Sequence, residues 1–330
     1  MNAIDKGSGR TNSVPLFGYT NEVLQADKQE FKNKYNIHSF KFNHTLNQSG
    51  LFEVPRIAKL ARKMIDNGGA ANFSATDFRR AALDTKFAAL PGAEKLADAI
   101  ERLGETGTWI KLTRAQDYDA DYAKILEMIT DDLERLADRP LRDEITWVGM
   151  TLLLSSPRIS TPFHIDHESN FLFQIRGEKD VCLFDAADRE LVTDIDLERF
   201  YGGNRGAANY KEGLQNHGTV YRLTPGEVVH HPPLAPHWVK NDDNISVSIS
   251  VGYCMRALER RARVYQANFM LRKIGLKPAS PGRSPMRDAF KTRFISAFEL
   301  RAPKTYTEIV YSPVDRLRSP LKTLAGFVKH

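Results

Sequence analysis

The sequence predicts a mainly β fold, an antiparallel sandwich or barrel with helical segments before and after it. Three observations support this prediction. The 330 residues are 42% hydrophobic, which is enough to bury a full core. Residues 146–255 contain many short apolar runs separated by turn residues, as antiparallel sheets do. On either side of that segment, the apolar residues recur with a helical period instead.

The residues that precede the strands are predicted to be helical. Residues 1–14 are polar, and we expect them to be flexible. PRIAKLARKMIDNGG, residues 55–69, places its apolar residues on one helical face and ends in a glycine pair. DADYAKILEMITDDLERLADRP, residues 119–140, predicts a second helix that a proline stops. No linker rich in Pro, Gly or Ser follows this helix, so we expect residues 15–145 to pack on the β core as a helical buttress.

Residues 146–255 are predicted to form the β core. The predicted strands are TWVGMTLLLSS, NFLFQI, KDVCLF, TVYRL, EVVHH and ISVSISVGY, and turns such as RGEK, TPGE and KNDDN join them. In ISVSISVGY, residues 245–253, isoleucines and valines take one face and serines, among them Ser250, take the other. A small polar face suits a wall that leaves room for a ligand, and exposure of these serines to solvent is the alternative.

The composition limits where the protein works and what it can bind. The first thirty or so residues hold no apolar run long enough for a signal peptide, and no uncharged apolar stretch of about 18 residues occurs, so we expect a cytoplasmic protein. Cys182 and Cys254 are the only cysteines, which excludes a disulfide framework and a zinc site with several thiolates. Any metal must therefore be held by histidine and carboxylate side chains.

One stretch, TPFHIDHESNFLFQIRGEK at residues 161–179, is unusually polar for a strand region. Side chains on a strand alternate between its faces, so His164 and Asp166 project together and can hold one ion. His237, at the start of the strand in PLAPHWV, is the candidate third ligand. Two imidazoles and one carboxylate on one side of an ion form the facial triad of non-haem Fe(II) oxygenases. This pattern predicts a metal centre.

Other histidines lie near the candidate triad. His167 points away from His164 and Asp166 if the strand is regular, so we do not expect it to be a ligand. His230 and His231 in EVVHH compete with the third ligand, because alternation turns one of the two inward. A hydrogen-bonded core imidazole is the simpler interpretation of that residue, and the sequence leaves open whether either contributes to the site.

The run Thr161, His164, Asp166, Asn170, Gly177 and Lys179, followed by TPGEVVHHPPLAPHWV and ISVSISVGY, resembles the cupin-like branch of the Jumonji C family of Fe(II)- and 2-oxoglutarate-dependent hydroxylases. Within that family it is most similar to the asparaginyl hydroxylases of the hypoxia-inducible factor. The resemblance covers about residues 146–255 and faintly the helical tail. It implies a double-stranded β-helix of the cupin or jelly-roll type. The iron ligands that it implies are His164, Asp166 and His237, and the residues that it places around 2-oxoglutarate are Thr161, Asn170, Lys179 and Ser250.

Two of these cosubstrate positions can be examined further from the residues. Lys179 alternates with Val181 and Leu183, which favours an inward ammonium that pairs with a carboxylate of the cosubstrate, whereas a surface lysine at a hairpin is the alternative. The family often has an asparagine near Ser250, so the serine leaves that contact open. Thr161 and Asn170 have plainer alternatives as hydrogen-bonding residues at turns or strand edges.

The resemblance also implies the reaction. It implies an enzyme that hydroxylates a C–H bond of a protein side chain, a peptide or a small metabolite with O2, while 2-oxoglutarate is decarboxylated to succinate and CO2. Glu168 stands where the asparaginyl hydroxylases have a glutamine that faces the substrate, and an acid there favours an amine, a guanidinium or a hydroxyl group. Trp238 is the second candidate substrate contact. The alternatives are a non-catalytic cupin-like sensor or transcription regulator and a metal-dependent isomerase, although an isomerase would have no use for the threonine, asparagine and lysine.

The C-terminal residues 256–330 are predicted to form a basic helical region. From residue 251 onward the chain has 17 Lys and Arg against 5 Asp and Glu. Such a surface fits a partner subunit, an anionic membrane or nucleic acid, and a solvated helix surface is an equal alternative. No helix-turn-helix or zinc-finger pattern is present, so we do not expect a nucleic-acid partner. We expect a homodimer through these helices, as in the hypoxia-factor hydroxylases, and peripheral membrane contact is the alternative.

Overall fold

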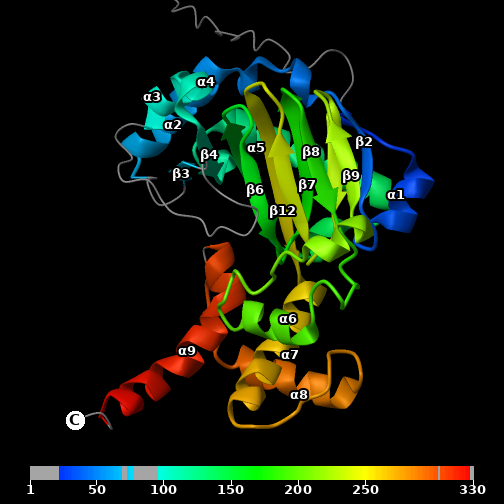
Figure 1. The fold of residues 1–330 in the computed structure, drawn as a ribbon, viewed down its shortest axis with the longest axis vertical. Coiled ribbons are helices and arrows are strands. Elements are labelled where there is room, and N and C mark those ends of the chain that lie inside the picture. The colour runs from blue at the N-terminus through cyan, green and yellow to red at the C-terminus, as the bar shows by residue number, and fades with distance from the viewer. Residues whose placement is uncertain (1–21, 69–72, 78–95, 304, 328–330) are drawn as a thin grey trace, which may run out of the picture.

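The protein folds around two antiparallel β-sheets that face each other, with helices beside and below them (Figure 1). The structure, a computed structural model, describes residues 22–68, 73–77, 96–303 and 305–327. Residues 1–14, which we expected to be flexible, lie outside the described residues. The mainly β character predicted from the sequence is confirmed.

The two sheets differ in size. The strands of the larger sheet lie in the order β1 (Leu24–Gln25), β2 (Phe40–His44), β10 (Glu227–His231), β7 (Ser169–Arg176), β12 (Ser246–Met255), β5 (Ile145–Ser155), β4 (Thr108–Thr113) and β3 (Phe73–Asp77). Those of the smaller sheet lie in the order β6 (Ser160–His164), β11 (His237–Asn241), β8 (Lys179–Leu183) and β9 (Thr219–Leu223). From β5 to β12 each strand lies in the sheet opposite to its predecessor, except that β9 pairs with β8.

The segment before residue 146, which was expected to be mainly helical, contributes strands as well as helices. β1 and β2 extend the larger sheet at one edge, and β4 and β3 extend it at the other. In β2, Phe40 and Phe42 are buried and alternate with Lys41 and Asn43, so the strand period is present but spans only a few residues. Short strands of this kind are easily lost between longer helical patterns.

Helices cover the outer face of the larger sheet. They are α1 (Lys28–Lys34), α2 (Val54–Asp66), α3 (Leu96–Glu101), α4 (Leu103–Thr106) and α5 (Ala120–Ala137), with 3-10 turns at η1 (Leu46–Gln48), η2 (Gly50–Phe52), η5 (Ala115–Asp117) and η6 (Leu141–Asp143). The apolar stripes of α2 and α5, including Leu60 and Ile129, share one buried cluster with Leu152 of β5 and Phe171 of β7. This cluster is the main core and holds the larger sheet in place.

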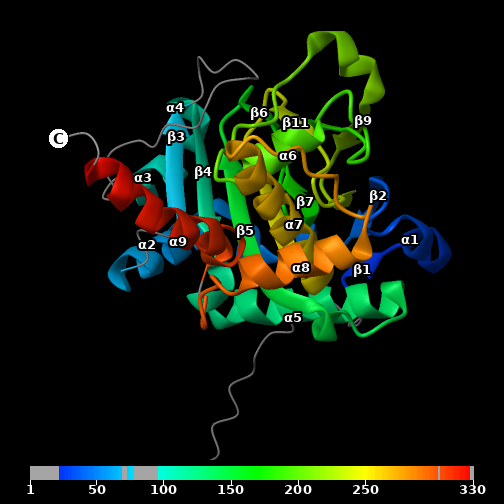
Figure 2. The same cartoon turned by 90° about the horizontal axis from the view of Figure 1, so that it is seen from below.

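The C-terminal helices gather at the lower end of the sheets. They are α7 (Arg256–Lys273), α8 (Pro285–Ser296) and α9 (Tyr306–Phe327), and they are joined there by α6 (Asp194–Tyr201) and the 3-10 helix η7 (Glu212–His217), which lie between β8 and β9 in the chain. The view from below shows α8 and α9 spread across this end (Figure 2). Phe163 and Phe184 from the outer side of the smaller sheet form a second cluster with Tyr201 of α6 and Tyr265 of α7. Among the described helices, none is both long enough and apolar enough to span a bilayer.

The two sheets turn their inner faces toward each other. Leu172 and Val229 of the larger sheet contact Val181 and Leu183 of the smaller one in a third buried cluster. On β12, Ser246 and Ser248 are fully buried and hydrogen-bond to Gln174 on the neighbouring β7. Solvent exposure of this serine face, the alternative considered from the sequence, is therefore wrong for these two residues.

The turn between β7 and β8 depends on Gly177, whose φ is +73°. A Cβ at this position would collide with the carbonyl oxygen of Ile245 and with Oδ1 of Asn244. We expect Gly177→Ala to lower the free energy of unfolding by ~2–4 kcal/mol, because the strain and the collision add. Chemical denaturation measures this, with Gly213→Ala as the control, since a Cβ at residue 213 meets nothing within 4 Å. Equal effects of the two substitutions would contradict the expectation.

Candidate active site

The three predicted ligand residues meet at one end of the smaller sheet. His164 of β6 and His237 of β11 stand opposite each other in the strand register, and Asp166 lies two residues beyond the end of β6. The Oδ2 atom of Asp166 lies 3.8 Å from Nε2 of His164 and 3.7 Å from Nε2 of His237. One ligand atom from each residue lies within 4.8 Å of the others, and among the described residues this is the one group of His, Cys, Asp or Glu side chains placed so that it could hold a metal ion.

Hydrogen bonds orient both imidazoles. Nδ1 of His164 lies 2.7 Å from the carbonyl oxygen of Pro162, and Nδ1 of His237 lies 3.0 Å from that of Ala235. When each Nδ1–H donates to its carbonyl, the Nε2 lone pairs are left to face Asp166 and can coordinate a metal. The side chains of His164 and Asp166 are 22% and 38% exposed, so an ion or a substrate can reach the triad from solvent.

The protonation states favour metal binding. Burial lowers the pKa of His237 to about 4, so its imidazole is neutral near pH 7. Burial acts to raise the pKa of Asp166, but the neighbouring His164 and His237 outweigh it and hold that pKa below its ordinary range. A neutral imidazole and an ionised carboxylate are the forms that ligate metals, so binding requires little loss of protons from these two groups.

Lys179 is a buried cation on the inner face of the smaller sheet. It is 3% exposed and shares its face of β8 with Val181 and Leu183, so the inward orientation predicted from the sequence is present. No acidic side chain forms an ion pair with it in the described part of the chain, and burial alone lowers its pKa to about 7. A buried ammonium without a counter-charge is costly, and an anion that enters between the sheets would remove the cost.

The remaining residues predicted around 2-oxoglutarate also lie on the inner faces. Asn170 of β7 donates from Nδ2 to the hydroxyl of Ser250 on β12 over 2.7 Å, and the same hydroxyl lies 3.1 Å from Oδ1 of Asn170. Thr161 of β6 is partly exposed and stands opposite Val239 in the register, on the face of β11 that carries His237. These three positions come from both sheets.

The two predicted substrate contacts lie in different places, Glu168 close to Asp166 and Trp238 on the outer face of β11. Glu168 lies two residues after Asp166, and burial together with that carboxylate raises the pKa of Glu168 to about 7. Trp238 lies on the opposite face of β11 from His237, and its indole donates to Oε1 of Gln215 in the outer cluster over 3.1 Å. The prediction that Trp238 contacts substrate is therefore corrected, because strand alternation turns it away from the triad.

The histidine pair on β10 divides between the two faces of the larger sheet. His230 points to the main core, where Nδ1 lies 3.0 Å from the carbonyl oxygen of Asn170 and Nε2 accepts from the backbone N–H of Asn36 over 3.0 Å. His231 points inward, with its ring 4.6 Å from that of His237. His230 is therefore the hydrogen-bonded core imidazole, on the face of the larger sheet that the helices cover. His231, on the inner face, lies beside the triad, and the Nε2 atom of His231 has no hydrogen-bond partner in the described structure.

His167 lies apart from the triad, as expected, although the segment between β6 and β7 that carries it is not a regular strand. Its Nδ1 lies 2.7 Å from the hydroxyl of Tyr201 on α6, and the side chain is fully buried. Burial lowers its pKa to about 3, with the positive charges of Arg263 and Arg261 acting in the same direction. This imidazole joins the segment after β6 to α6.

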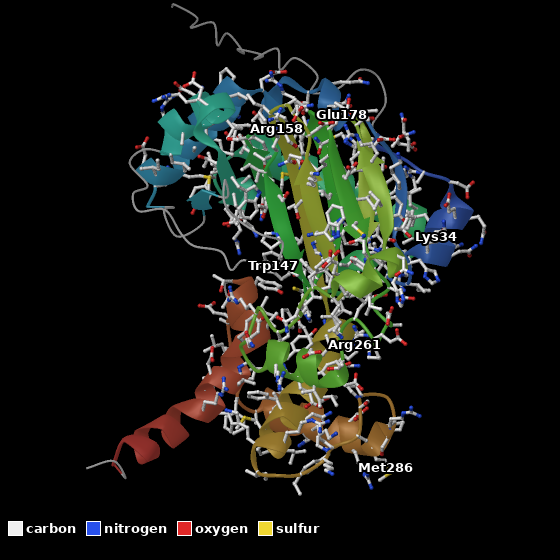
Figure 3. The ribbon with its side chains drawn as sticks, in the orientation of Figure 1. Lys34, Trp147, Arg158, Glu178, Arg261 and Met286 are labelled. Atoms are coloured by element: carbon white, nitrogen blue, oxygen red, sulfur yellow. The ribbon has the colours of Figure 1, made fainter. Side chains whose placement is uncertain are left out.

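Three residues near the triad were not found from the sequence. Lys111 of β4 stands opposite Leu153 on the inner face, and its charge acts on both Asp166 and Glu168. Trp147 lies at the lower end of the sheets, close to the start of α9 (Figure 3). Tyr306 is the first residue of α9. The alternation in β4 could have revealed Lys111, whereas nothing in the sequence links a C-terminal tyrosine to this site.

The comparisons with known proteins find distant likenesses. No protein-family model matches the chain, and no curated protein matches its sequence. Among solved structures, it is similar to the ribosomal oxygenase YcfD of Escherichia coli, with a TM-score of 0.47, 14% identity, and coverage of 92% of this chain and 68% of that chain. A complex of YcfD with cobalt and 2-oxoglutarate gives a TM-score of 0.46, 14% identity, and coverage of 92% and 67%.

A second kind of enzyme matches over a smaller part. The DMSP lyase DddQ of Ruegeria pomeroyi matches with a TM-score of 0.22, 17% identity, and coverage of 32% of this chain and 38% of that chain. These likenesses are too distant to assign a function. The arrangement of the site residues has to do so instead.

Proposed function

We propose that the chain is an Fe(II)- and 2-oxoglutarate-dependent oxygenase that hydroxylates a C–H bond of a protein side chain, a peptide or a small metabolite. One observation carries the proposal: the two histidines of a His, His, Asp triad and a buried lysine, which has no ion pair among the described residues, share the inner face of one sheet. β11 pairs with β8, so that His237 stands opposite Leu183 and Lys179 lies four residues further along. At about 3.3 Å per residue this is roughly 13 Å, a span that a lysine side chain and a five-carbon diacid can bridge together.

We infer that β5 to β12 form a double-stranded β-helix. The alternation of successive strands between the two sheets supports this, because a chain that winds around two facing sheets produces that order. The winding brings β6 and β11 side by side although His164 and His237 are 73 positions apart in the chain. A metal centre at this place joins two distant parts of the chain.

The donor atoms fit the proposed ligands. Two imidazole nitrogens and one carboxylate oxygen suit Fe(II) and leave coordination positions open. The Lys179 ammonium suits a terminal carboxylate of 2-oxoglutarate, and Thr161, Asn170 and Ser250 offer hydrogen-bonding groups on the same inner faces. When bound, Fe(II) and 2-oxoglutarate supply the oxidation, in which one atom of O2 enters the substrate as a hydroxyl group and the other enters succinate as CO2 leaves.

The chain's own residues have three tasks in this proposal. The backbone carbonyls of Pro162 and Ala235 keep the two imidazoles in the orientation that ligation needs. The lysine sets the position of the cosubstrate along the sheet. Leu172 and Val229, buried on the opposing inner face, keep water away from the ammonium and strengthen its interaction with a carboxylate.

The test is turnover of 2-oxoglutarate by the full chain. We expect the purified protein with Fe(II), 2-oxoglutarate, ascorbate and air to form succinate faster than the same mixture without protein, as measured by NMR. Binding of both ligands without succinate formation, even with a library of peptides and metabolites, would favour the non-catalytic sensor. Absence of binding would contradict the proposal itself.

We further propose that the chain forms a homodimer through its C-terminal helices. Met286 and Phe290 lie one turn apart on α8 and are 86% and 73% exposed. Ile274 and Leu276, just after α7, are exposed as well. Met286 lies at the lower end of the molecule, away from the sheets (Figure 3). Clustered exposed apolar side chains mark interaction surfaces, and a second copy would cover them.

Charges on this surface should break the dimer. We expect Met286→Glu with Phe290→Glu to reduce the sedimenting mass by half at micromolar concentration, whereas Ile37→Glu, at a residue that is 59% exposed on the N-terminal side, should change nothing. A wild-type chain that sediments as a monomer would contradict the dimer. Binding of that monomer to anionic liposomes, lost in the double variant, would support peripheral membrane contact instead.

A further inference from the structure

Asn241, the last residue of β11, lies beside the buried Lys179. The two residues are paired in the strand register, four residues along β11 from His237. Val239 packs on the inner cluster, so alternation directs Asn241 to the same inner face. Glu178, which precedes the lysine, marks this upper end of the sheets (Figure 3). The Asn241 side chain is 4% exposed, so a buried amide lies next to a buried ammonium.

Both side chains of this pair lack partners for their polar groups. Oδ1 of Asn241 is buried and has no hydrogen-bond partner among the described residues. Lys179 has no ion pair in the part of the chain that the structure describes. Residues paired in antiparallel strands have Cβ atoms about 4.5–5.5 Å apart, so one ligand can touch both side chains. Burial without partners is costly, and a ligand that joins the two groups would remove the cost.

Polar side chains on the facing sheet do not supply the missing partners. Gln174 of β7 lies four residues beyond Asn170, as Asn241 lies four beyond the histidine ligand on β11. Its amide nitrogen donates to the hydroxyl of Ser246, and its amide oxygen accepts from the hydroxyl of Ser248. These three side chains therefore satisfy one another, unlike the pair on the smaller sheet.

The inner faces are apolar between this pair and the triad. Val181 and Val239 of the smaller sheet and Leu172 and Val229 of the larger one belong to the inner cluster. A ligand that reaches from the triad to Asn241 passes these side chains. The layout suits a molecule with a polar group at each end and methylene groups between them.

A carboxylate is the group that satisfies both Lys179 and Asn241. An ammonium has three N–H donors, and a side-chain amide has an acceptor oxygen and an NH2 donor. The ammonium can donate to Oδ1 of Asn241 and to one carboxylate oxygen, while the amide donates to the other oxygen. A methyl group in place of the carboxylate would leave the ammonium unpaired and the amide without an acceptor.

We propose that Asn241 binds the distal carboxylate of the cosubstrate together with Lys179, and that this pair makes the site specific for a dicarboxylate. This inference rests on the proposed function and deepens it by naming a residue that selects the cosubstrate. The residues that the family resemblance implies around 2-oxoglutarate are Thr161, Asn170, Lys179 and Ser250, and Asn241 is not among them.

The first test compares two ligands of the metal that differ at the distal end. 2-Oxoglutarate and oxalate, which has no distal arm, are titrated into the full chain loaded with Co(II), and the visible absorption of the metal reports binding. We expect Asn241→Leu to weaken 2-oxoglutarate about 10- to 100-fold, through loss of a hydrogen bond to a charged group. Oxalate should bind as to the wild type. Equal weakening of both ligands would overturn the proposal, because damage to the fold or to the metal site acts on both.

The second test needs no metal. Asn241→Asp puts a carboxylate beside the ammonium, where the proposal places that of the cosubstrate. We expect the metal-free chain to melt roughly 2–4 °C higher, because the buried cation gains a partner. With Co(II) present, 2-oxoglutarate should bind at least about 100-fold more weakly, because the place of its distal carboxylate is taken. Asn43→Asp, at an exposed position of β2, should change neither quantity. A lower melting temperature or normal 2-oxoglutarate binding in Asn241→Asp would overturn the proposal.

The inference and the proposed function fail in different ways. Failure of Co(II) and 2-oxoglutarate to bind to the wild type would overturn the oxygenase, whereas the melting temperature of metal-free Asn241→Asp would still show whether the ammonium accepts a carboxylate there. Normal binding to the wild type, together with equal effects of Asn241→Leu on 2-oxoglutarate and oxalate, would overturn the role of Asn241 alone.

Discussion

The double variant His164→Ala with His237→Ala should lose the weak visible charge-transfer band that we expect when Fe(II) and 2-oxoglutarate are added without oxygen. Two of the three ligand atoms disappear, and the remaining Asp166 carboxylate is partly exposed and cannot hold Fe(II) by itself. We expect metal affinity to fall at least roughly 100-fold, since even loss of a residue that only supports a ligand costs 10–100-fold. Anaerobic absorption spectroscopy measures both the band and the affinity.

His217→Ala is the matched control for this experiment. His217 also pairs with a carboxylate, with Nδ1 lying 2.7 Å from Oδ2 of Asp188, but it belongs to η7 on the outside of the smaller sheet. The band should keep its intensity in this variant. Persistence of the band in the double variant would mean that the metal is held elsewhere, and the oxygenase proposal would fall.

Lys179→Met should weaken the binding of 2-oxoglutarate, and it should raise the stability of the protein that has no 2-oxoglutarate bound. Without the ammonium a carboxylate enters an apolar region unpaired, so we expect the dissociation constant to rise at least about 100-fold. In the empty protein the same substitution removes a buried charge that has no ion-pair partner among the described residues, and we expect about 1–4 kcal/mol of added stability. Ligand titration and chemical denaturation measure the two effects.

The stability gained through Lys179→Met should depend on pH in a definite direction. Burial lowers the pKa of Lys179 from 10.5 to about 7, so between those values the unfolded chain binds more protons than the folded one. The free energy of unfolding of the wild type therefore rises as pH increases from 7. The difference between its free energy of unfolding and that of Lys179→Met should become smaller over the same range. Lys240→Met, at an exposed position of β11, is the control and should leave both quantities unchanged. A Met variant that is less stable and binds 2-oxoglutarate normally would contradict an inward functional lysine.

The sequence allowed much of the β core to be predicted because its signals are local. Alternation along a strand depends only on neighbouring residues, and it placed His164 with Asp166 and Lys179 with Val181. The same rule excluded His167 as a ligand, and the structure turns that residue toward Tyr201. Alternation from His237 turns Trp238 outward, which is why the expected substrate contact at Trp238 is absent from the inner face.

Residues that meet across the fold were harder to find. Nothing local distinguishes His231 from His237 as the third ligand, since both are inward on strands that lie beside the triad. The choice depends on which strand lies next to β6, and that strand is β11. Tyr306 was missed for the same reason: it is 138 residues from Glu168 in the chain and reaches that carboxylate only because α9 packs at the lower end of the sheets.

The sequence by itself determined most of the strands within residues 146–255, the face that most of their side chains take, and the kinds of ligand atoms present. The tertiary structure decided which of those faces meet, and therefore which ligand atoms lie close together and which buried lysine has no ion pair among the described residues. The physical reason is the range of the forces involved. Backbone geometry sets alternation over a few residues, whereas burial of apolar surface brings distant segments together without regard to their separation in the chain.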